Sequence, residues 1–326
     1  MTGSQRRALG LVGLSRSTWH YRGRPRARVA DPVTQSDRAY RSRISDTDRA
    51  RVVERITTGW AQGVSVDHCF AQAWDAGVML ASRRSWWRIA ASIPDQSERP
   101  VAPTRRGSTR APREAPVLVA DGPGQVWSWD ITDLRTPWRG MAFKAYSIID
   151  IYSRKLVGYR VEDREVDVLA VEMFAQAFAR EGVPTAVHAD SGPAMRSNVL
   201  RELLAQHGVT QTHNRPRVSN DNPFSESEFR TMKYRPGYPG TFDTIEQART
   251  FMAHYVPWYN TSHKHSGIAL FSPQQVHDGT WRRTWTQREN TQRAYHDAHP
   301  ERFHRQPTTP TPAATVGINM PKPDTE

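Results

Sequence analysis

Three acidic residues stand in unusual places in this sequence. Asp130 lies inside the aromatic and apolar run VWSWDITDL, where a charge is costly to bury unless it is paired or binds a metal. Asp190 ends the apolar run AVHAD, and Glu226 lies one turn into the run NPFSESEFRTMK. The three carboxylates are candidates for one reactive site, provided that the fold brings them together.

Spacing alone does not identify such a site. Fifty-nine residues separate Asp130 from Asp190, and thirty-five separate Asp190 from Glu226. From residue 120 onward the chain holds 23 acidic residues, so chance supplies about two acid pairs at any chosen separation. The prediction therefore depends on the elements that carry these residues and on the sequence around them.

The elements around the carboxylates follow a mixed order. Aromatic and β-branched runs predict three antiparallel strands, and apolar periodicity then predicts alternating helices and strands. The expected strands are 126–132, 141–150, 155–161, 186–190 and 209–213, and the expected helices are 166–180, 198–207, 225–234 and 244–259. This order is typical of an α/β fold with a mixed five-stranded sheet. The first and fourth strands are then neighbours, and the helix after the fifth crosses their ends, so Asp130, Asp190 and Glu226 converge.

The region before residue 120 has a different character. Its expected parts are a partial helix-turn-helix (1–22), a basic linker (23–44), a small all-α module of three helices (45–94) and a Pro-, Arg- and Ser-rich linker (95–119). Arg83, Arg84 and Arg88 begin the third helix of the module, where a recognition helix contacts DNA, and Arg16 is a further candidate contact. The alternative for the three module arginines is a solvated basic helix face.

The rest of the chain divides at residue 280. We expect the α/β core to span 120–280 and a partly disordered, Pro- and Thr-rich tail to span 281–326. Within the core, Trp127 and Trp129 are expected to face the interior. His188 and His213 are expected to pack or form hydrogen bonds there and not to bind metal.

Composition limits the classes of protein. The chain of 326 residues has 21 Lys and Arg against 10 Asp and Glu up to residue 119, and 24 against 23 after it. Such asymmetry favours a polyanionic partner for the N-terminal part. The single cysteine excludes an intramolecular disulfide framework and Cys-rich zinc modules. No run of apolar residues is long enough to span a membrane, and we expect a soluble, cytoplasmic protein without a membrane partner.

Several motifs in order resemble one family. The runs WSWDIT, IIDIYSRKLVG, HADSGP, DNPFSESEFRTMK and HSGIALFSPQQV are similar to those of DDE transposases of bacterial insertion sequences, of the second-reading-frame type. These enzymes belong to the retroviral-integrase superfamily. The resemblance covers about residues 45–303, and several motifs in the right order are far more specific than any one of them.

The resemblance implies an RNase H-like core preceded by a helix-turn-helix module. It also implies that Asp130, Asp190 and Glu226 are catalytic and hold two Mg²⁺ or Mn²⁺ ions, which prefer oxygen ligands. Water would first release a 3′-OH at the element end, and that hydroxyl would then attack a target phosphodiester. By the same resemblance, Lys233 contacts DNA.

Two positions near the third carboxylate depart from the family pattern, and the first is Pro223, where the family often has alanine. Glu228 stands where the family often has an aromatic residue, and it is a rival for Glu226. Glu226 is preferred because the thirty-five-residue gap fits it and because Lys233 follows two helical turns later, on the same face. Asn222 precedes this helix as a DNA contact or as a helix cap.

Two other functions remain open from the sequence. One is an RNase H-like nuclease, since carboxylates and metals do not by themselves choose strand transfer over hydrolysis. The other is a non-catalytic DNA-binding regulatory partner, which would work with, or fused to, the product of the upstream reading frame. Expected partners are DNA, both element ends and target, and a second copy of the chain or more on paired ends. A nucleoid-associated bacterial protein fits these expectations.

Overall fold

The computed structural model describes residues 9, 12–23, 33–34, 40, 42–100, 116–190, 192–215 and 222–320. It divides the chain into two compact units, residues 1–43 and 44–326. In the first unit the described helix is α2 (Arg16–Gly23), at the end of the expected partial helix-turn-helix. Most of the linkers expected at 23–44 and 95–119 lies outside the described residues.

The second unit begins with a small helical module. Its helices are α3 (Asp46–Ala61), α4 (Val66–Asp75) and α5 (Arg83–Ala91). Each follows a serine N-cap, namely Ser45, Ser65 and Ser82, whose hydroxyl accepts a hydrogen bond from the third residue after it. Apolar side chains from all three helices form one cluster. The three helices predicted from periodicity, and the cap at Ser82, are confirmed.

A mixed five-stranded sheet forms the centre of the second unit. Its strands are β2 (Val126–Arg135), β3 (Ala142–Asp150), β4 (Leu156–Glu162), β5 (Ala186–Ala189) and β6 (Thr210–His213). The strand order is β4-β3-β2-β5-β6, in which β2, β3 and β4 are antiparallel neighbours while β5 and β6 run parallel to β2. This is the predicted RNase H-like arrangement, with the first and fourth core strands side by side.

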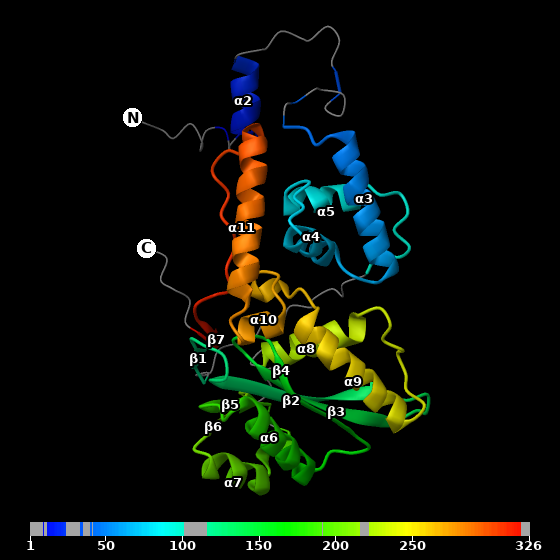
Figure 1. Ribbon diagram of the computed structural model, residues 1–326, viewed down its shortest axis with the longest axis vertical. Coiled ribbons are helices and arrows are strands. Elements are labelled where there is room, and N and C mark those ends of the chain that lie inside the picture. The colour runs from blue at the N-terminus through cyan, green and yellow to red at the C-terminus, as the bar shows by residue number, and fades with distance from the viewer. Residues whose placement is uncertain are drawn as a thin grey trace. The chain divides into compact units, whose positions relative to one another are not determined.

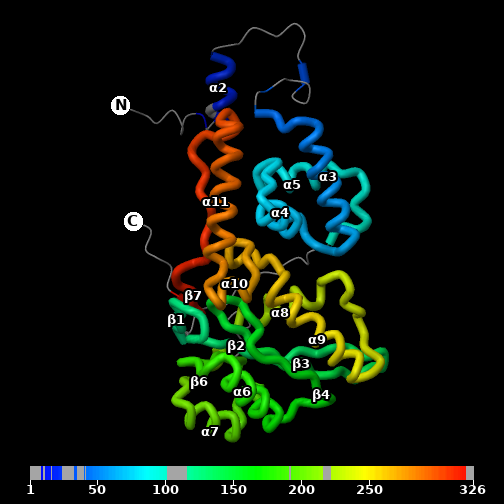
Figure 2. The backbone as a smooth tube through the Cα atoms, viewed as in Figure 1, coloured from blue at the N-terminus to red at the C-terminus, as the bar shows by residue number. Residues whose placement is uncertain are grey.

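Helices cover both faces of this sheet (Figures 1 and 2). Those on one face are α6 (Asp167–Glu181) and α7 (Asn198–Gln206), and those on the other are α8 (Pro223–Tyr234) and α9 (Ile245–Thr261). The core helices and strands begin and end within three residues of their predicted bounds. The α/β fold class, with helices before the core, is therefore confirmed.

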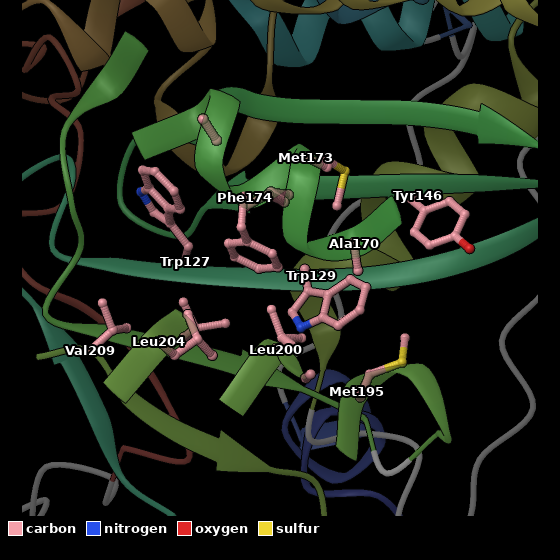
Figure 3. Packing of buried hydrophobic residues seen from close by; sticks show 14 of the residues in the cluster. Trp127, Trp129, Tyr146, Ala170, Met173, Phe174, Met195, Leu200, Leu204 and Val209 are labelled. Carbon is pink, nitrogen blue, oxygen red and sulfur yellow. The ribbon is translucent and has the colours of Figure 1, made fainter. Parts of the chain in front are cut away.

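Side-chain alternation in β2 separates the two faces. Trp127 and Trp129 are fully buried and pack against Phe174 and Phe178 of α6 (Figure 3). Leu134, an even-numbered residue of the same strand, packs in the cluster formed with α8 and α9. Because successive side chains of a strand point to opposite faces, the even-numbered residues Ser128, Asp130 and Thr132 face α8.

The C-terminal part of the unit is more ordered than predicted. After α10 (Pro273–His277) the chain forms α11 (Trp281–Ala298), and β7 (Val316–Ile318) pairs with β1 (Leu118–Ala120). The sequence did not predict these two elements within the tail expected at 281–326. Apolar periodicity could not reveal α11, because the buried residue of that helix is an arginine, Arg288. Among the described helices, none has the length and apolar character needed to cross a membrane.

Arg288 ties α11 to the helical module. Its Nε donates to Asp75 Oδ1 of α4 at 2.6 Å, and its other guanidinium nitrogens donate to the carbonyls of Ala269 and Leu270, each at 2.8 Å. Lys264 Nζ donates to the second oxygen of Asp75 at 2.6 Å. A buried arginine with a carboxylate and two carbonyl acceptors is a satisfied network. The helical module is thus part of the same compact unit as the core.

Candidate active site

The polar residues of β2 meet α8 at two points. Near the start of the strand, the Ser128 hydroxyl donates to Asn222 Oδ1 and lies 3.1 Å from the Ser225 hydroxyl. Further along, Lys233 Nζ donates to Thr132 Oγ1 at 2.6 Å. These contacts hold the two ends of α8 on one face of β2, and Asp130 lies between them.

Asp130 is the electrostatic centre of this face. Its half-buried carboxylate accepts a hydrogen bond from the main-chain N–H of Ile131 at 2.8 Å. Burial, together with the nearby carboxylates of Asp190 and Glu226, raises the pKa of Asp130 from 3.8 to about 7. Asp190 and Glu226 therefore lie close enough to Asp130 to act on its charge. The three predicted carboxylates come from β2, from the end of β5 and from α8.

The carboxylates are not turned toward a common centre. Within the described part of the chain, no three His, Cys, Asp or Glu side chains are arranged to ligate one ion. Asp190 Oδ1 accepts from the main-chain N–H of Gly192 at 2.8 Å, which turns this carboxylate toward the loop after β5.

Glu228 occupies a different environment from Glu226. Glu226 is exposed on α8, whereas Glu228 is fully buried between α8 and the sheet. Glu228 Oε2 accepts from the Ser147 hydroxyl of β3 at 3.2 Å, while Oε1 is buried without a hydrogen-bond partner. Burial raises the pKa of Glu228 from 4.5 to about 7. A carboxyl group enclosed in this way cannot present its oxygens to an ion or to DNA at the surface.

Asn222 is turned into the protein. Its side chain is 2% exposed, and besides its contact with Ser128 its Nδ2 donates to the Trp129 carbonyl at 3.3 Å. It makes no side-chain capping bond to α8, although it is the N-cap residue. Both polar groups of its amide therefore bind β2 and fix the start of α8 to that strand. Arg16 begins α2, but its side chain lies outside the described residues.

The three arginines of α5 differ from one another. Arg83 forms a two-pronged ion pair with Asp67, with donor–acceptor distances of 2.7 and 2.6 Å. Arg84 and Arg88 are exposed one helical turn apart on α5, and Arg88 also donates to the Ser85 hydroxyl at 2.9 Å. Arg84 and Arg88 thus present their charges to solvent, whereas the charge of Arg83 is paired with that of Asp67.

Two histidines of the core form hydrogen bonds within the fold. The His188 ring nitrogens lie 2.8 Å from Thr212 Oγ1 and 2.7 Å from Asn214 Oδ1. His213 Nδ1 lies 2.8 Å from the main-chain oxygen of Asp190 and so supports the loop that carries this carboxylate.

Sequence reasoning missed the serines and the threonine that fasten α8 to the sheet. Ser128 and Thr132 alternate with apolar residues in β2, and Ser147 stands directly opposite Asp130 in the β2–β3 register. A polar residue at every second position of an otherwise apolar strand was the available signal. That pattern shows that one strand face is polar, but it does not show which helix covers it.

Comparison with known proteins gives a family match to the core. Two models of the integrase core domain match the chain, one over residues 120–219 and the other over 207–273. Together they extend from Ala120, the last residue of β1, to Pro273, the first residue of α10. They include all three carboxylates. The family resemblance predicted from the motifs is confirmed.

Individual relatives agree with this match. The chain is 31% identical over 161 residues to the transposase for insertion sequence element IS904 of Lactococcus lactis subsp. lactis, covering 48% of this chain and 63% of that protein. It is 30% identical over 161 residues to transposase InsF for insertion sequence IS3A of Escherichia coli K12, covering 48% and 55%. The alignments thus span between 55% and 63% of the length of these relatives. A solved structure of the HTLV-2 integrase catalytic core domain in complex with magnesium is 16% identical, covers 48% of this chain and 97% of that chain, and aligns with a TM-score of 0.38.

Proposed function

We propose that this chain, whose residues 120–273 form an integrase core domain of the retroviral-integrase superfamily, is a DDE-type DNA transposase of a bacterial insertion sequence. The proposal is supported by the family match over residues 120–273 and by the places of Asp130 on β2, Asp190 after β5 and Glu226 on α8, all within that match. The relatives that it matches are transposases, which favours strand transfer over simple hydrolysis.

The site suits divalent cations by its donor chemistry. Asp130, Asp190 and Glu226 offer oxygen ligands alone, which hard ions such as Mg²⁺ and Mn²⁺ prefer. The mutual repulsion that contributes to the raised pKa of Asp130 would be relieved by positive charge. Two divalent cations held by these three residues would supply the charge that activates an attacking oxygen and stabilises a leaving one.

The remaining residues of the site have positioning roles. Lys233, fixed by Thr132 on the face of β2 that carries Asp130, would place a positive charge beside a DNA phosphate. Ser128 and Asn222 hold the start of α8, and therefore Glu226, against the same strand. In this arrangement the substrate phosphodiester lies over the carboxylates, and water or a DNA 3′-OH attacks it in line. The exposed Arg84 and Arg88 of α5 would contact DNA phosphates at a distance from the reaction.

The test is a strand-transfer assay with labelled duplexes that carry the ends of the insertion sequence. Asp130→Asn, Asp190→Asn and Glu226→Gln are compared with the wild type in Mg²⁺ and in Mn²⁺, and Glu228→Gln serves as the matched control on the same helix. We expect the first three variants to lose joining by at least about a thousandfold while they retain binding to the end duplex. Glu228→Gln should keep joining within about tenfold. Full activity in any of the three variants would remove that residue from the proposed site.

The proposal extends to partners. Joining two element ends to a target requires two ends in one complex, and we propose a dimer or larger assembly on paired DNA ends. Light scattering of the protein with end duplexes should give at least two chains per complex with two ends. A single chain per complex that still joins paired ends would contradict this part of the proposal.

A further inference from the structure

A cavity of about 460 Å³ lies on the side of α8 that faces away from the sheet. Its walls come from α8, from the turn between α3 and α4, and from the end of α9. Among the described residues that line it are Arg230, Arg235, Trp87, Tyr234 and Trp258, and none of the described lining residues is acidic. A cavity of this size is large enough for a small organic ligand. The absence of carboxylates from these walls favours a ligand that carries negative charge.

Arg235 is the clearest anchor for an anion. Its guanidinium carbon lies 3.8 Å from the centre of the Trp258 ring, and the stacking fixes the plane of the guanidinium group. Burial lowers the pKa of Arg235, and it forms no ion pair with another described residue. A half-buried arginine without a carboxylate partner gains from a phosphate, which its planar group can bind through two hydrogen bonds.

Two aromatic side chains provide flat surfaces beside it. Trp87 is 39% exposed, and its ring is held by a 2.8 Å hydrogen bond from Nε1 to the Asp67 carboxylate, which also holds Arg83. Tyr234 is 57% exposed at the end of α8. A ring that is already fixed loses little freedom when a base stacks on it. Phosphate-binding and base-stacking groups therefore line one cavity.

The position of the cavity relates it to the carboxylates. Glu226 and Tyr234 are eight residues apart on α8, which corresponds to about 12 Å along the helix axis. At about 3.4 Å per nucleotide along one DNA strand, this distance is about three to four nucleotides. Along the helix axis, the cavity therefore lies within a few nucleotides of Glu226.

We propose that this cavity binds one unpaired nucleotide of the DNA substrate, with the base stacked on Trp87 and Tyr234 and a phosphate held by Arg235. A cavity with aromatic walls accepts a single base that has left its pair, whereas a base pair presents its edges and not its faces. The inference rests on the proposed function, because it takes DNA as the substrate. It adds that the protein selects DNA with an unpaired segment close to the reacting phosphate.

Fluorescence binding assays on the full chain test the proposal. The probes are one duplex with a four-nucleotide single-stranded overhang that contains 2-aminopurine and the same duplex with blunt ends, both in EDTA so that no reaction occurs. Stacking of a base on an aromatic ring corresponds to about tenfold in affinity. We therefore expect about tenfold tighter binding of the overhang duplex and quenching of its fluorescence. Arg235→Gln and Trp87→Leu should lose both effects.

One variant serves as a control and another as a reserve. Trp138→Leu removes a tryptophan that is 53% exposed and does not line the cavity, and it should leave the overhang preference unchanged. If Trp87→Leu fails to fold, as judged by circular dichroism, Tyr234→Leu replaces it, since that side chain is more exposed. Equal binding of overhang and blunt duplexes by the wild type would overturn the proposal, as would an unchanged preference in the cavity variants.

The outcome can be separated from that of the proposed function. Glu226→Gln should abolish joining but keep the overhang preference, because Glu226 does not line the cavity. A wild-type protein that shows the preference without joining DNA would support the cavity and refute the proposed transposase activity. A wild-type protein that joins DNA without the overhang preference would support the transposase activity and refute the role proposed for the cavity.

Discussion

The buried carboxyl of Glu228 makes the stability of the protein depend on pH in a calculable way. In the unfolded chain this group loses its proton near its ordinary pKa of 4.5, and in the folded chain it keeps the proton up to about pH 7. Between these values the unfolded state ionises and the folded state does not, so folding becomes less favourable as the pH rises. A rise from 4.5 to about 7, at about 1.4 kcal/mol per pKa unit, corresponds to a loss of about 3 kcal/mol above pH 7.

The Glu228→Gln substitution removes this loss. The glutamine amide has nearly the same shape, and its oxygen can still accept the hydrogen bond from Ser147, but it does not ionise. We expect the free energy of unfolding of the variant to exceed that of the wild type by up to about 3 kcal/mol at pH 8.5 and by less than about 1 kcal/mol at pH 4.5.

Urea denaturation in EDTA at the two pH values measures the difference, and chelation keeps metal binding from altering the result. Glu202→Gln, which changes an exposed glutamate of α7, is the matched control and should show little effect at either pH. If the stability gain of Glu228→Gln is the same at both pH values, then Glu228 is not protonated in the folded protein and the burial argument is wrong. The same variant keeps joining activity if Glu226 is the third carboxylate.

Three further predictions follow from individual contacts. Arg288→Met should lower the free energy of unfolding by about 3–5 kcal/mol in urea melts, because it leaves the Asp75 carboxylate partly unpaired; a loss below about 1 kcal/mol would show that the network is not stabilising. Gly63→Ala should cost at least about 1 kcal/mol more than Gly208→Ala in thermal melts. Both glycines have a positive φ, of 68° and 70°. A Cβ added at Gly63 would lie 2.0 Å from the Pro236 ring, whereas one added at Gly208 would meet nothing within 4 Å; equal losses of stability would refute close packing at Gly63. Lys233→Gln should reduce the slope of log affinity for end DNA against log salt by about 1, and an unchanged slope would mean that this lysine contacts no phosphate.

Local patterns were enough to predict most of the fold. Each helix of the module begins at a serine cap that the sequence displays, and the alternation of tryptophan with polar residues in β2 predicts which side chains enter the core. These features depend on neighbours within a few residues, so they can be recognised without the tertiary structure. The helix α11 was missed because its buried residue is an arginine, Arg288, whose partner Asp75 lies far away in the chain.

By itself the sequence determined the order of strands and helices, and it supplied the prediction that Asp130, Asp190 and Glu226 meet. That prediction rests on sheet topology, because β2 and β5 are neighbouring strands and the helix that bears Glu226 crosses their ends. The tertiary structure alone decided that Glu228 is enclosed and that Asn222 faces inward, two residues that the sequence left open or assigned to DNA. The physical reason is that α8 can turn any of its polar residues toward the sheet. Hydrogen bonds to Ser128, Thr132 and Ser147, far away in the chain, select the rotation that is observed.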